Sequence, residues 1–457
     1  MRNDGHDDND EPEEVVCPGK YFIKEKIGFE QVEGQQFVYW NSHQQIHRDD
    51  VFETLITGLR YLPSQELAWP LAVEPQDFVS ETDLFQSVRD YISLYWDYAD
   101  ERAYDVFAAW VMATWLSEAW YSVPFFFFVG PWDSGKTRGL DIIKSIGYRG
   151  WEVPSTTTAT IFRCDKAFSP TWLFDESEYL AQESKQEVIG LINSRYRRGQ
   201  VVPRMKGDSY QVELFPVFGF TALAGTQDLL RTTKSRCIVF NMTPADREIP
   251  PILFPEDEDA VRLRNKLLMY RVTKLESIVT RSVTTLSCDD VTMVTQAGGK
   301  GRMIELYYPL VVVAPTQSIK DRILSYMKDE QVRIRAELTS DDDALIFRSM
   351  VDVKHETGAD GLLITEVAGK VNENLPEKEK LTNRRIGYIC RSLGFSTVHT
   401  RVGTAVMWNA SKARRLSFRF GVDIPLSIVT IVTSSHETAV TEAVTIDGQF
   451  VTKGGSP

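Results

Sequence analysis

Apolar residues recur at helical spacing in the segment that begins near residue 80. Leu84, Val88 and Ile92 form a first run, and a second run extends over 104–120. Residues three or four positions apart share one face of a helix, so each run predicts an amphipathic helix. The two runs also contain aromatic residues, such as Tyr104 and Trp110. Aromatic residues at helical spacing are more typical of core packing than of a platform that stacks nucleobases.

Five short apolar runs follow between Phe125 and Met242, and helical stretches separate them. The runs lie near 125–129, 151–153, 171–175, 217–224 and 237–242. Strands that alternate with helices are typical of a mostly parallel sheet with helices on its faces, so the predicted fold class is α/β of the P-loop type.

Helical patterns dominate the segment after the fifth strand, and a different order follows it. Three Asp residues at 341–343 precede three predicted helices in 345–393 and a hairpin in 395–408, which is the order of a winged helix. The predicted domains are an acidic disordered N-terminus (1–20), a small β-containing segment (21–79), a helical approach and parallel-sheet core (80–245), a helical lid (246–340), a winged helix (341–424) and a flexible tail (425–457).

Composition places the chain among globular proteins of two or three domains. It has 457 residues, of which 43% are hydrophobic, and no run of about twenty apolar residues that spans a bilayer. Its five cysteines are scattered without a C-x-x-C pair, which favours a reducing compartment, so we expect a cytoplasmic protein without a membrane anchor. The net charge of −13 disfavours nucleic acid as a partner, but the charge is unevenly distributed.

A glycine-rich motif follows the first apolar strand directly. It fits the pattern G-x-x-x-x-G-K-[ST] with Gly130, Pro131, Trp132, Asp133, Ser134, Gly135, Lys136 and Thr137. A strand, this loop and a helix N-terminus together form a cradle of backbone N–H groups for phosphates. We expect the chain to bind a nucleoside triphosphate, with Lys136 on the β- and γ-phosphates and Thr137 on Mg²⁺. A simple glycine-rich turn explains neither the preceding strand nor the lysine.

Two carboxylates end the third apolar strand, in the pattern called Walker B. Asp175 is expected to bind Mg²⁺, and Glu176 to position and deprotonate the attacking water. Strands often end in a solvated carboxylate, so the pair gains its meaning from the phosphate loop that precedes it.

The order of these motifs resembles that of AAA+ ATPases of the MCM-like and superfamily-3 helicase group. In particular it resembles the primase-helicase-like ATPases of plasmids, viruses and integrated elements of archaea and bacteria, over residues 80–420. The resemblance implies ATP and Mg²⁺ as cofactors, a homo-oligomeric and hexameric ring, and DNA as partner. It also implies a sensor at Thr226, although such families often have Asn there, and an arginine finger at Arg236, which follows Ser235 before the last strand. The alternative for Arg236 is a basic helix end that complements the helix dipole.

The resemblance also implies a DNA-contacting hairpin between the third helix and the fourth strand. Residues 200–214 form two polar-apolar stretches around a turn at Lys206, which such helicases present to DNA in the central channel. An exposed turn lysine without a partner is the alternative.

The last module restores the basic charge that the whole-chain average hides. Residues 377–420 hold ten Lys and Arg against two Glu. Arg384 and Arg385 lie at the start of the third helix and Arg401 lies at the hairpin tip, where winged helices contact DNA. A solvated basic face or a protein-docking winged helix is the alternative.

Together these patterns predict a ring-forming, ATP-hydrolysing motor on DNA, namely a replication helicase of a mobile genetic element. Two alternatives remain open at this point. The first is a replication initiator or loader that remodels DNA without processive unwinding. The second is a nucleotide-gated DNA-binding scaffold that hydrolyses ATP only incidentally.

Overall fold

The computed structural model describes residues 12–54, 57–177, 186–205, 211–284, 289–339, 342–373, 375–425 and 428. The chain forms two compact units, Met1–Glu330 and Gln331–Pro457. Over the part of the chain so described, we find no helix with the length and apolar character needed to cross a membrane.

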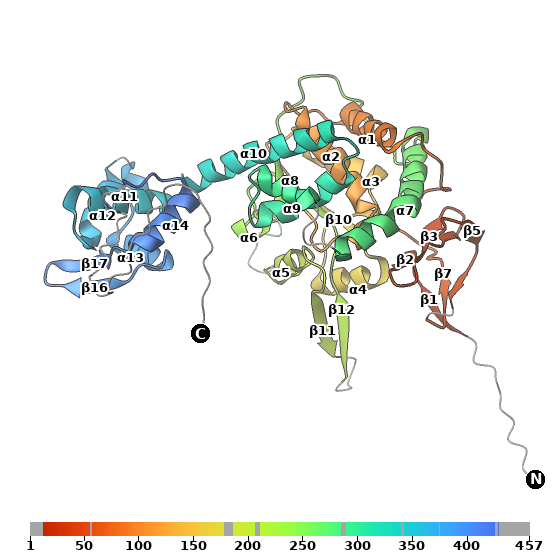
Figure 1. The fold of residues 1–457 in the computed structure, drawn as a ribbon, viewed down its shortest axis with the longest axis horizontal. Helices are drawn as coiled ribbons and strands as arrows, with labels where there is room; N and C mark the ends of the chain where they lie inside the picture. The colour runs from red at the N-terminus through yellow and green to blue at the C-terminus, as the bar shows by residue number, and fades with distance from the viewer. Residues whose placement is uncertain are drawn as a thin grey trace, which may run out of the picture. The chain divides into compact units, whose positions relative to one another are not determined.

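A five-stranded sheet forms the centre of the first unit (Figure 1). Its strands are β8 (Phe125–Val129), β9 (Gly150–Glu152), β10 (Thr171–Phe174), β13 (Thr221–Gly225) and β14 (Cys237–Asn241). The spatial order is β14-β8-β13-β10-β9, and every neighbouring pair is parallel. The predicted α/β fold class with a mostly parallel sheet is therefore confirmed.

Strand β8 lies inside the sheet, between β14 and β13, and is apolar throughout because helices cover both of its faces. Its four phenylalanines are completely buried. On one face, Phe126 stacks on Trp110 of α2 (Arg102–Thr114) with ring centroids 4.5 Å apart. On the other face, the ring of Phe125 meets Tyr196, which follows α5 (Gln186–Ser194).

The direction in which the chain leaves each strand decides where a ligand site forms. From β8 the chain crosses by α3 (Lys136–Ile146) to β9 at one edge, whereas from β13 it passes through α6 (Arg231–Lys234) to β14 at the other edge. Right-handed crossovers then place the two connections on opposite faces of the sheet. The carboxyl ends of β8 and β13 therefore diverge into a crevice, which is where open α/β sheets bind ligands.

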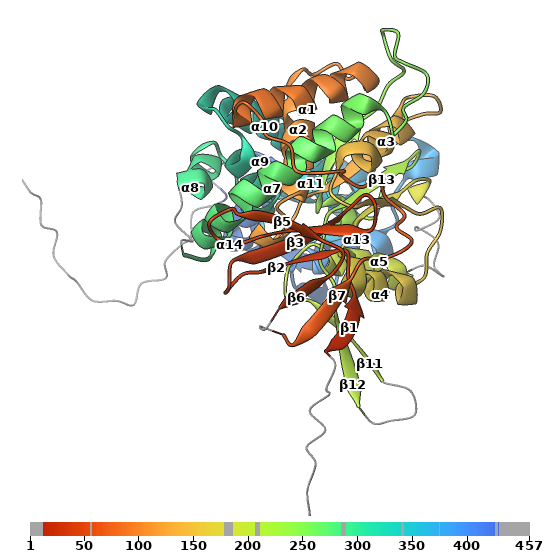
Figure 2. The same cartoon turned by 90° about the vertical axis from the view of Figure 1, so that its right-hand side faces the viewer.

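The segment before the sheet supplies a small β module and two helices. The strands are β1 (Glu13–Val16), β2 (Gly19–Phe22), β3 (Ile27–Val32), β4 (Gln36–Trp40), β5 (Ile46–Asp49), β6 (Phe52–Thr54) and β7 (Leu59–Leu62), followed by α1 (Glu81–Tyr95) and α2. The seven strands form the sheets β2-β3-β4-β5 and β1-β7-β6 (Figure 2). Both sheets contribute to an aromatic cluster centred on Phe29. A buried ion pair of 2.6 Å between Glu30 and Arg149 ties this module to the core.

Between α3 and β13, the described residues also form two helices and a hairpin besides β9 and β10. The helices are α4 (Thr158–Phe168) and α5, and the hairpin pairs β11 (Val201–Met205) with β12 (Val212–Pro216). Both views show the hairpin extending beyond α4 and α5 (Figures 1 and 2). Phe215 at its base is buried against Phe162 of α4, which fixes the hairpin to the core.

Helices follow the sheet, as the apolar pattern predicts, and four of them lie in the described residues up to 339. They are α7 (Glu258–Thr284), α8 (Asp289–Gln296), α9 (Arg302–Val313) and α10 (Gln317–Thr339). Within the first unit, α7 packs against α1 and α3, and α9 packs against α2. These helices thus complete the core of that unit, and the finer domain boundaries stay predictions.

The second unit combines helices with a small sheet. Its elements are α11 (Asp342–Thr357), β15 (Gly361–Leu363), α12 (Ile364–Asn372), α13 (Asn383–Ser392), β16 (Thr397–Thr400), β17 (Gly403–Met407) and α14 (Ala410–Phe420). The three strands form the sheet β15-β17-β16. The three predicted helices and the hairpin lie where the sequence places them, whereas α14 is not predicted; it buries Phe420 against Phe347 of α11.

Candidate functional site

The loop between β8 and α3 has a backbone that only certain residues adopt. Gly135, the residue before α3, has φ +80°, and Asp133 has φ +58°, a region that side-chain-bearing residues other than Asp and Asn rarely enter. A Cβ atom on Gly130 would lie 2.4 Å from the Met242 carbonyl oxygen. The two glycines of the motif are therefore required for different reasons. Gly135 adopts a left-handed backbone conformation, and Gly130 packs closely against Met242, the residue after β14.

Polar groups of this loop converge at the N-terminus of α3. Lys136 is the first residue of α3, and its Nζ donates a 2.5 Å hydrogen bond to the Pro131 carbonyl oxygen. The Ser134 hydroxyl donates to the same oxygen at 2.8 Å. The lysine ammonium and the first N–H groups of the helix thus lie at one place, which is suited to bind phosphate.

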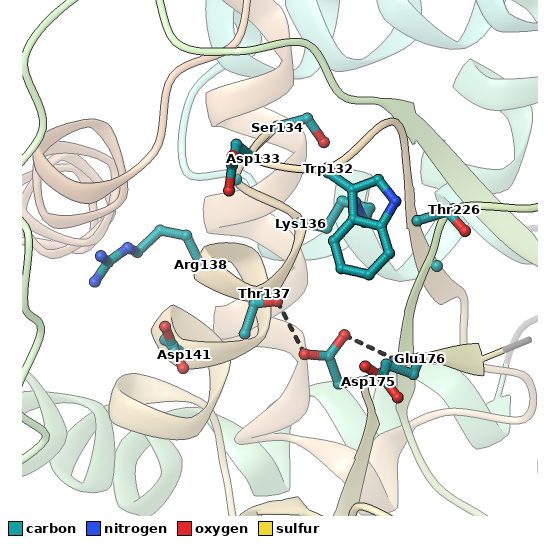
Figure 3. A pocket seen from close by; sticks show the side chains of 12 residues that line it. Trp132, Asp133, Ser134, Lys136, Thr137, Arg138, Asp141, Asp175, Glu176 and Thr226 are labelled. Carbon is teal, nitrogen blue, oxygen red and sulfur yellow. Dashed lines mark hydrogen bonds between the residues drawn. The ribbon is translucent and has the colours of Figure 1, made fainter. Parts of the chain in front are cut away.

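Asp175 and Glu176 follow β10 directly and are oriented differently. Thr137 Oγ1 donates to Asp175 Oδ2 at 2.9 Å, and the Glu176 N–H donates to Asp175 Oδ1 at 2.8 Å (Figure 3). Glu176 has φ +50°, so the chain turns sharply after Asp175. The turn leaves Asp175 beside the threonine hydroxyl and Glu176 as a separate carboxylate at the same edge.

These residues line one open pocket with a volume of about 760 Å³. Its lining is formed by Trp132, Asp133, Ser134, Gly135, Lys136, Thr137, Arg138, Asp141, Asp175, Glu176, Gly225 and Thr226. The volume is in the range of small-molecule sites. The threonine hydroxyl and the Asp175 carboxylate 2.9 Å away are hard oxygen donors of the kind that Mg²⁺ prefers beside a phosphate, so the residues present fit a nucleotide with its Mg²⁺.

Thr226 lies at this pocket because β13 is the neighbour of β8. The Gly130 N–H donates to the Gly225 carbonyl oxygen at 3.2 Å, which holds the ends of the two strands together. Figure 3 shows the exposed indole of Trp132 between Lys136 and Thr226. Of the residues predicted for the cofactor and the metal, Trp132 to Thr137, Asp175 and Thr226 line this pocket together with Glu176, whereas Gly130 and Pro131 belong to the same loop but do not line it.

Two residues that line the pocket are not predicted by the sequence motifs. Arg138 and Asp141 lie on the first turns of α3, and burial raises the pKa of Asp141 above its ordinary value. The only sequence signal for them is their position one and four residues after Thr137 on the same helix.

A second, smaller hollow of about 210 Å³ lies against the same loop. Asp133, Ser134, Gly135 and Arg138 line both pockets, and the second is completed by Tyr95, Trp96, Asp97, Met242, Thr243, Ala245, Ile249, Pro250 and Pro251. Arg138 donates to the Pro251 carbonyl oxygen at 2.8 Å, which ties α3 to the segment after β14. No sequence motif marks this hollow, since its walls come from three separate segments of the chain, within 95–97, 133–138 and 242–251.

Arg236 lies far from the pocket of its own chain. It precedes β14, and its carbonyl oxygen accepts a 3.0 Å hydrogen bond from the N–H of Phe125, the first residue of β8. The phosphate loop begins after Val129, the last residue of that strand, so the two lie about 16 Å apart at a rise of about 3.3 Å per residue. The structure therefore separates Arg236 from Lys136 and Glu176 within the chain.

The residues predicted for DNA contact lie elsewhere. Lys206 is outside the described residues, although β11 and β12 on either side of it are present. Arg384 and Arg385 are exposed in the first turn of α13, and Arg401 is exposed in the turn between β16 and β17. Arg385 lies 3.9 Å from Asp342, and both side chains are half exposed, so this contact leaves the guanidinium accessible.

No protein-family model and no curated protein matches the chain. Among solved structures, it is similar to the apo structure of the NrS-1 C-terminal region, with 11% identity and a TM-score of 0.33, over 84% of this chain and 97% of that one. It is also similar to the X-ray structure of JCV helicase, with 12% identity and a TM-score of 0.24, over 55% of this chain and 61% of that one. Likenesses at these scores carry no conclusion about activity, which rests on the site itself.

Proposed function

We propose that this chain is an ATP-hydrolysing AAA+ motor that assembles into a ring, a hexamer, and acts on DNA as a replication helicase of a mobile genetic element. The observation that carries the proposal is the separation of Arg236 from the phosphate loop by the length of β8. An arginine at the opposite edge of the sheet cannot reach its own nucleotide. It can reach the nucleotide of a second copy when the two copies pack head to tail, and such contacts close into rings.

In this proposal the residues of one copy bind the nucleotide and activate water. The N–H groups of the loop and the Lys136 ammonium bind the β- and γ-phosphates, and the adjacent 210 Å³ hollow accommodates the nucleoside. Thr137 and Asp175 hold Mg²⁺, which when bound neutralises negative charge on the phosphates. Glu176 accepts a proton from the attacking water, and Thr226 orients it beside the γ-phosphate.

The neighbouring copy supplies Arg236. Its guanidinium stabilises the negative charge that develops on the γ-phosphoryl group, an effect worth about 10³- to 10⁵-fold in rate. Because the residue belongs to another subunit, hydrolysis at one site is coupled to the position of the next subunit. This coupling is what a ring needs to move along DNA.

Two other features support DNA as the track. The second unit has the element order of a winged helix, with Arg384, Arg385 and Arg401 exposed where such modules contact phosphates. Lys206 lies in the sequence between β11 and β12, and we assign to that lysine the contact with DNA in the channel.

The test is unwinding of a forked DNA duplex by the purified chain, measured beside its ATPase rate with and without DNA. We expect ATP-dependent strand displacement, DNA-stimulated turnover, and loss of both in Lys136→Ala. Stimulated turnover without displacement would indicate an initiator or loader. Turnover that ignores DNA would indicate a nucleotide-gated scaffold and contradict the motor.

A further inference from the structure

Three segments distant in sequence meet at the edge of the sheet where its strands begin. Tyr196, which follows α5, is buried, and the guanidinium carbons of Arg236 and Arg302 lie 5.7 and 5.5 Å from the centroid of its ring. Arg302 is the first residue of α9, and its Nη1 donates a hydrogen bond to the Ser235 hydroxyl. Arg302 thus contacts Tyr196, on which Arg236 also packs, and Ser235, the residue before Arg236.

Within the described part of the chain, neither guanidinium forms an ion pair. Among the described residues, no carboxylate lies within ion-pair distance of either Arg236 or Arg302. The nearby Glu305, one turn further along α9, binds Arg197 at 2.5 Å. Arg236 Nη1 donates to the Thr232 carbonyl oxygen, while its Nε is buried without a hydrogen-bond partner in the described part of the chain.

The electrostatics of Arg236 agree with this picture. Burial lowers the pKa of Arg236, and the positive charge of Arg302 lowers it further. Two cations on one aromatic ring are held close together by the fold at the expense of mutual repulsion. An anion placed between them removes that repulsion.

We propose that Arg302 is a second cation of the trans site, which together with Arg236 receives the terminal phosphate of the nucleotide bound by a second copy of this chain. The inference rests on the proposed function, since it requires a neighbouring copy. A γ-phosphoryl group spreads its charge over three oxygens, and two guanidinium forks can bind more of them than one. When the γ-phosphate leaves, the two arginines again face each other without an anion, so the contact between copies weakens after hydrolysis.

The neighbouring arginines do not share this property. Arg197 is neutralised by Glu305. Arg198 donates to the carbonyl oxygens of Trp120 and Ser117, and therefore serves the fold. Like Arg236, Arg302 has no carboxylate partner in the described structure, and the hydrogen bond given for its guanidinium goes to the Ser235 hydroxyl and not to a backbone carbonyl.

The experiment compares Arg302→Ala, Arg302→Gln, Arg236→Ala and the control Arg262→Ala in the full chain. Arg262 is an exposed arginine of α7 that pairs with Glu258 and Asp259 of its own helix. Assembly is measured by sedimentation with a non-hydrolysable ATP analogue or with ADP, and turnover by phosphate release. Nucleotide affinity of the dilute chain is measured with a fluorescent ATP analogue.

We expect Arg302→Ala to lower turnover by at least about tenfold and to raise the protein concentration needed for analogue-dependent assembly by a similar factor, with nucleotide affinity unchanged. Arg302→Gln keeps a donor for Ser235 but lacks the charge, and it should fail in the same way. Arg262→Ala should assemble and turn over like the unmodified chain.

Each other outcome has a separate meaning. Full assembly and turnover in Arg302→Ala, with Arg236→Ala inactive, would overturn the second cation and leave the proposed function standing. Rescue by Arg302→Gln would overturn it too, because it would show that Arg302 only holds Ser235 in place. Unchanged turnover in Arg236→Ala would contradict the trans site itself.

Discussion

The different roles of Asp175 and Glu176 follow from the backbone between them. Asp175 accepts hydrogen bonds from Thr137 and from the Glu176 N–H, so both of its oxygens have partners. Glu176 follows with φ +50°, and its carboxylate is a separate group lining the same pocket. A carboxylate so placed is suited to accept a proton, whereas Asp175 is suited to hold a metal ion.

The first prediction concerns this proton acceptor. Glu176→Gln should bind ATP as the unmodified chain does but hydrolyse it at least about a hundredfold more slowly, since an amide cannot take the proton. Phosphate release and nucleotide binding measured on the same sample check it, with the exposed Glu187→Gln on α5 as control. Near-normal turnover would remove Glu176 from this role.

A second residue-scale prediction concerns acid stability. Although burial favours its neutral form, the Arg271 guanidinium 2.5 Å away holds the pKa of Glu118 at about 2, below the ordinary value of 4.5. The folded state therefore binds fewer protons than the unfolded state between these values. The resulting stabilisation, roughly 3 kcal/mol, is complete above about pH 4.5 and is lost as the pH falls toward 2.

The measurement is the free energy of unfolding between pH 5 and pH 3. The unmodified chain should lose more stability over this interval than Glu118→Gln, which already lacks the charged pair at pH 5. Glu101→Gln, which removes an exposed carboxylate paired with Arg89, is the control and should follow the unmodified chain. Equal slopes for all three proteins would show that the Glu118 pair does not contribute.

At the scale of elements, local patterns in the sequence predict local structure well. Strand β8, the phosphate loop and the start of α3 are contiguous, so their apolar run and glycines are sufficient to predict these elements and the pocket residues from Trp132 to Thr137. Contacts between distant segments leave no such pattern. Arg138 meets Pro251 across 113 residues, and Arg302 meets Ser235 across 67.

The helix α14 shows a second reason for missed structure. Its buried positions are Ala413, Leu416 and Phe420, and the residues between them are mostly basic. Three apolar positions among many basic residues do not form an amphipathic pattern strong enough to predict a helix. Its place becomes evident only when Phe420 packs on Phe347 of α11.

The prediction at the scale of elements concerns the hairpin of β11 and β12. Lys206→Ala should keep DNA-free ATPase activity, because no residue of β11 or β12 lines the pocket, but lose DNA stimulation and strand displacement together. Lys26→Ala, which removes an exposed lysine of the N-terminal β module, is the control. Full unwinding by Lys206→Ala would contradict the hairpin assignment, and equal loss of both activities would assign the lysine to the fold or the ring.

At the scale of the whole molecule, the charge distribution separates two tasks. The chain has a net charge of −13, yet residues 377–420 hold ten Lys and Arg against two Glu. An acidic first unit disfavours unspecific binding of DNA over its surface, while the basic module offers one place for it. The division into two compact units at residue 330 is consistent with such a separation.

The salt dependence of DNA binding tests this separation. Replacing Arg384, Arg385 and Arg401 together by Ala should lower duplex affinity and flatten the slope of log K against log salt by about 2 to 3, since each lost phosphate contact removes about 0.9. Basal ATPase activity should remain. An unchanged slope would favour a winged helix that docks on protein.

The central claim, a nucleotide site completed by a second copy, is tested most directly by mixing two inactive variants. Arg236→Ala keeps its own phosphate loop but offers no finger, whereas Lys136→Ala offers a finger but binds no nucleotide. In a random one-to-one mixture, about a quarter of the head-to-tail interfaces combine an intact loop with an intact finger. We predict that the mixture recovers roughly that fraction of the unmodified ATPase rate while each variant alone stays inactive; a mixture as inactive as its components would contradict a site shared between subunits.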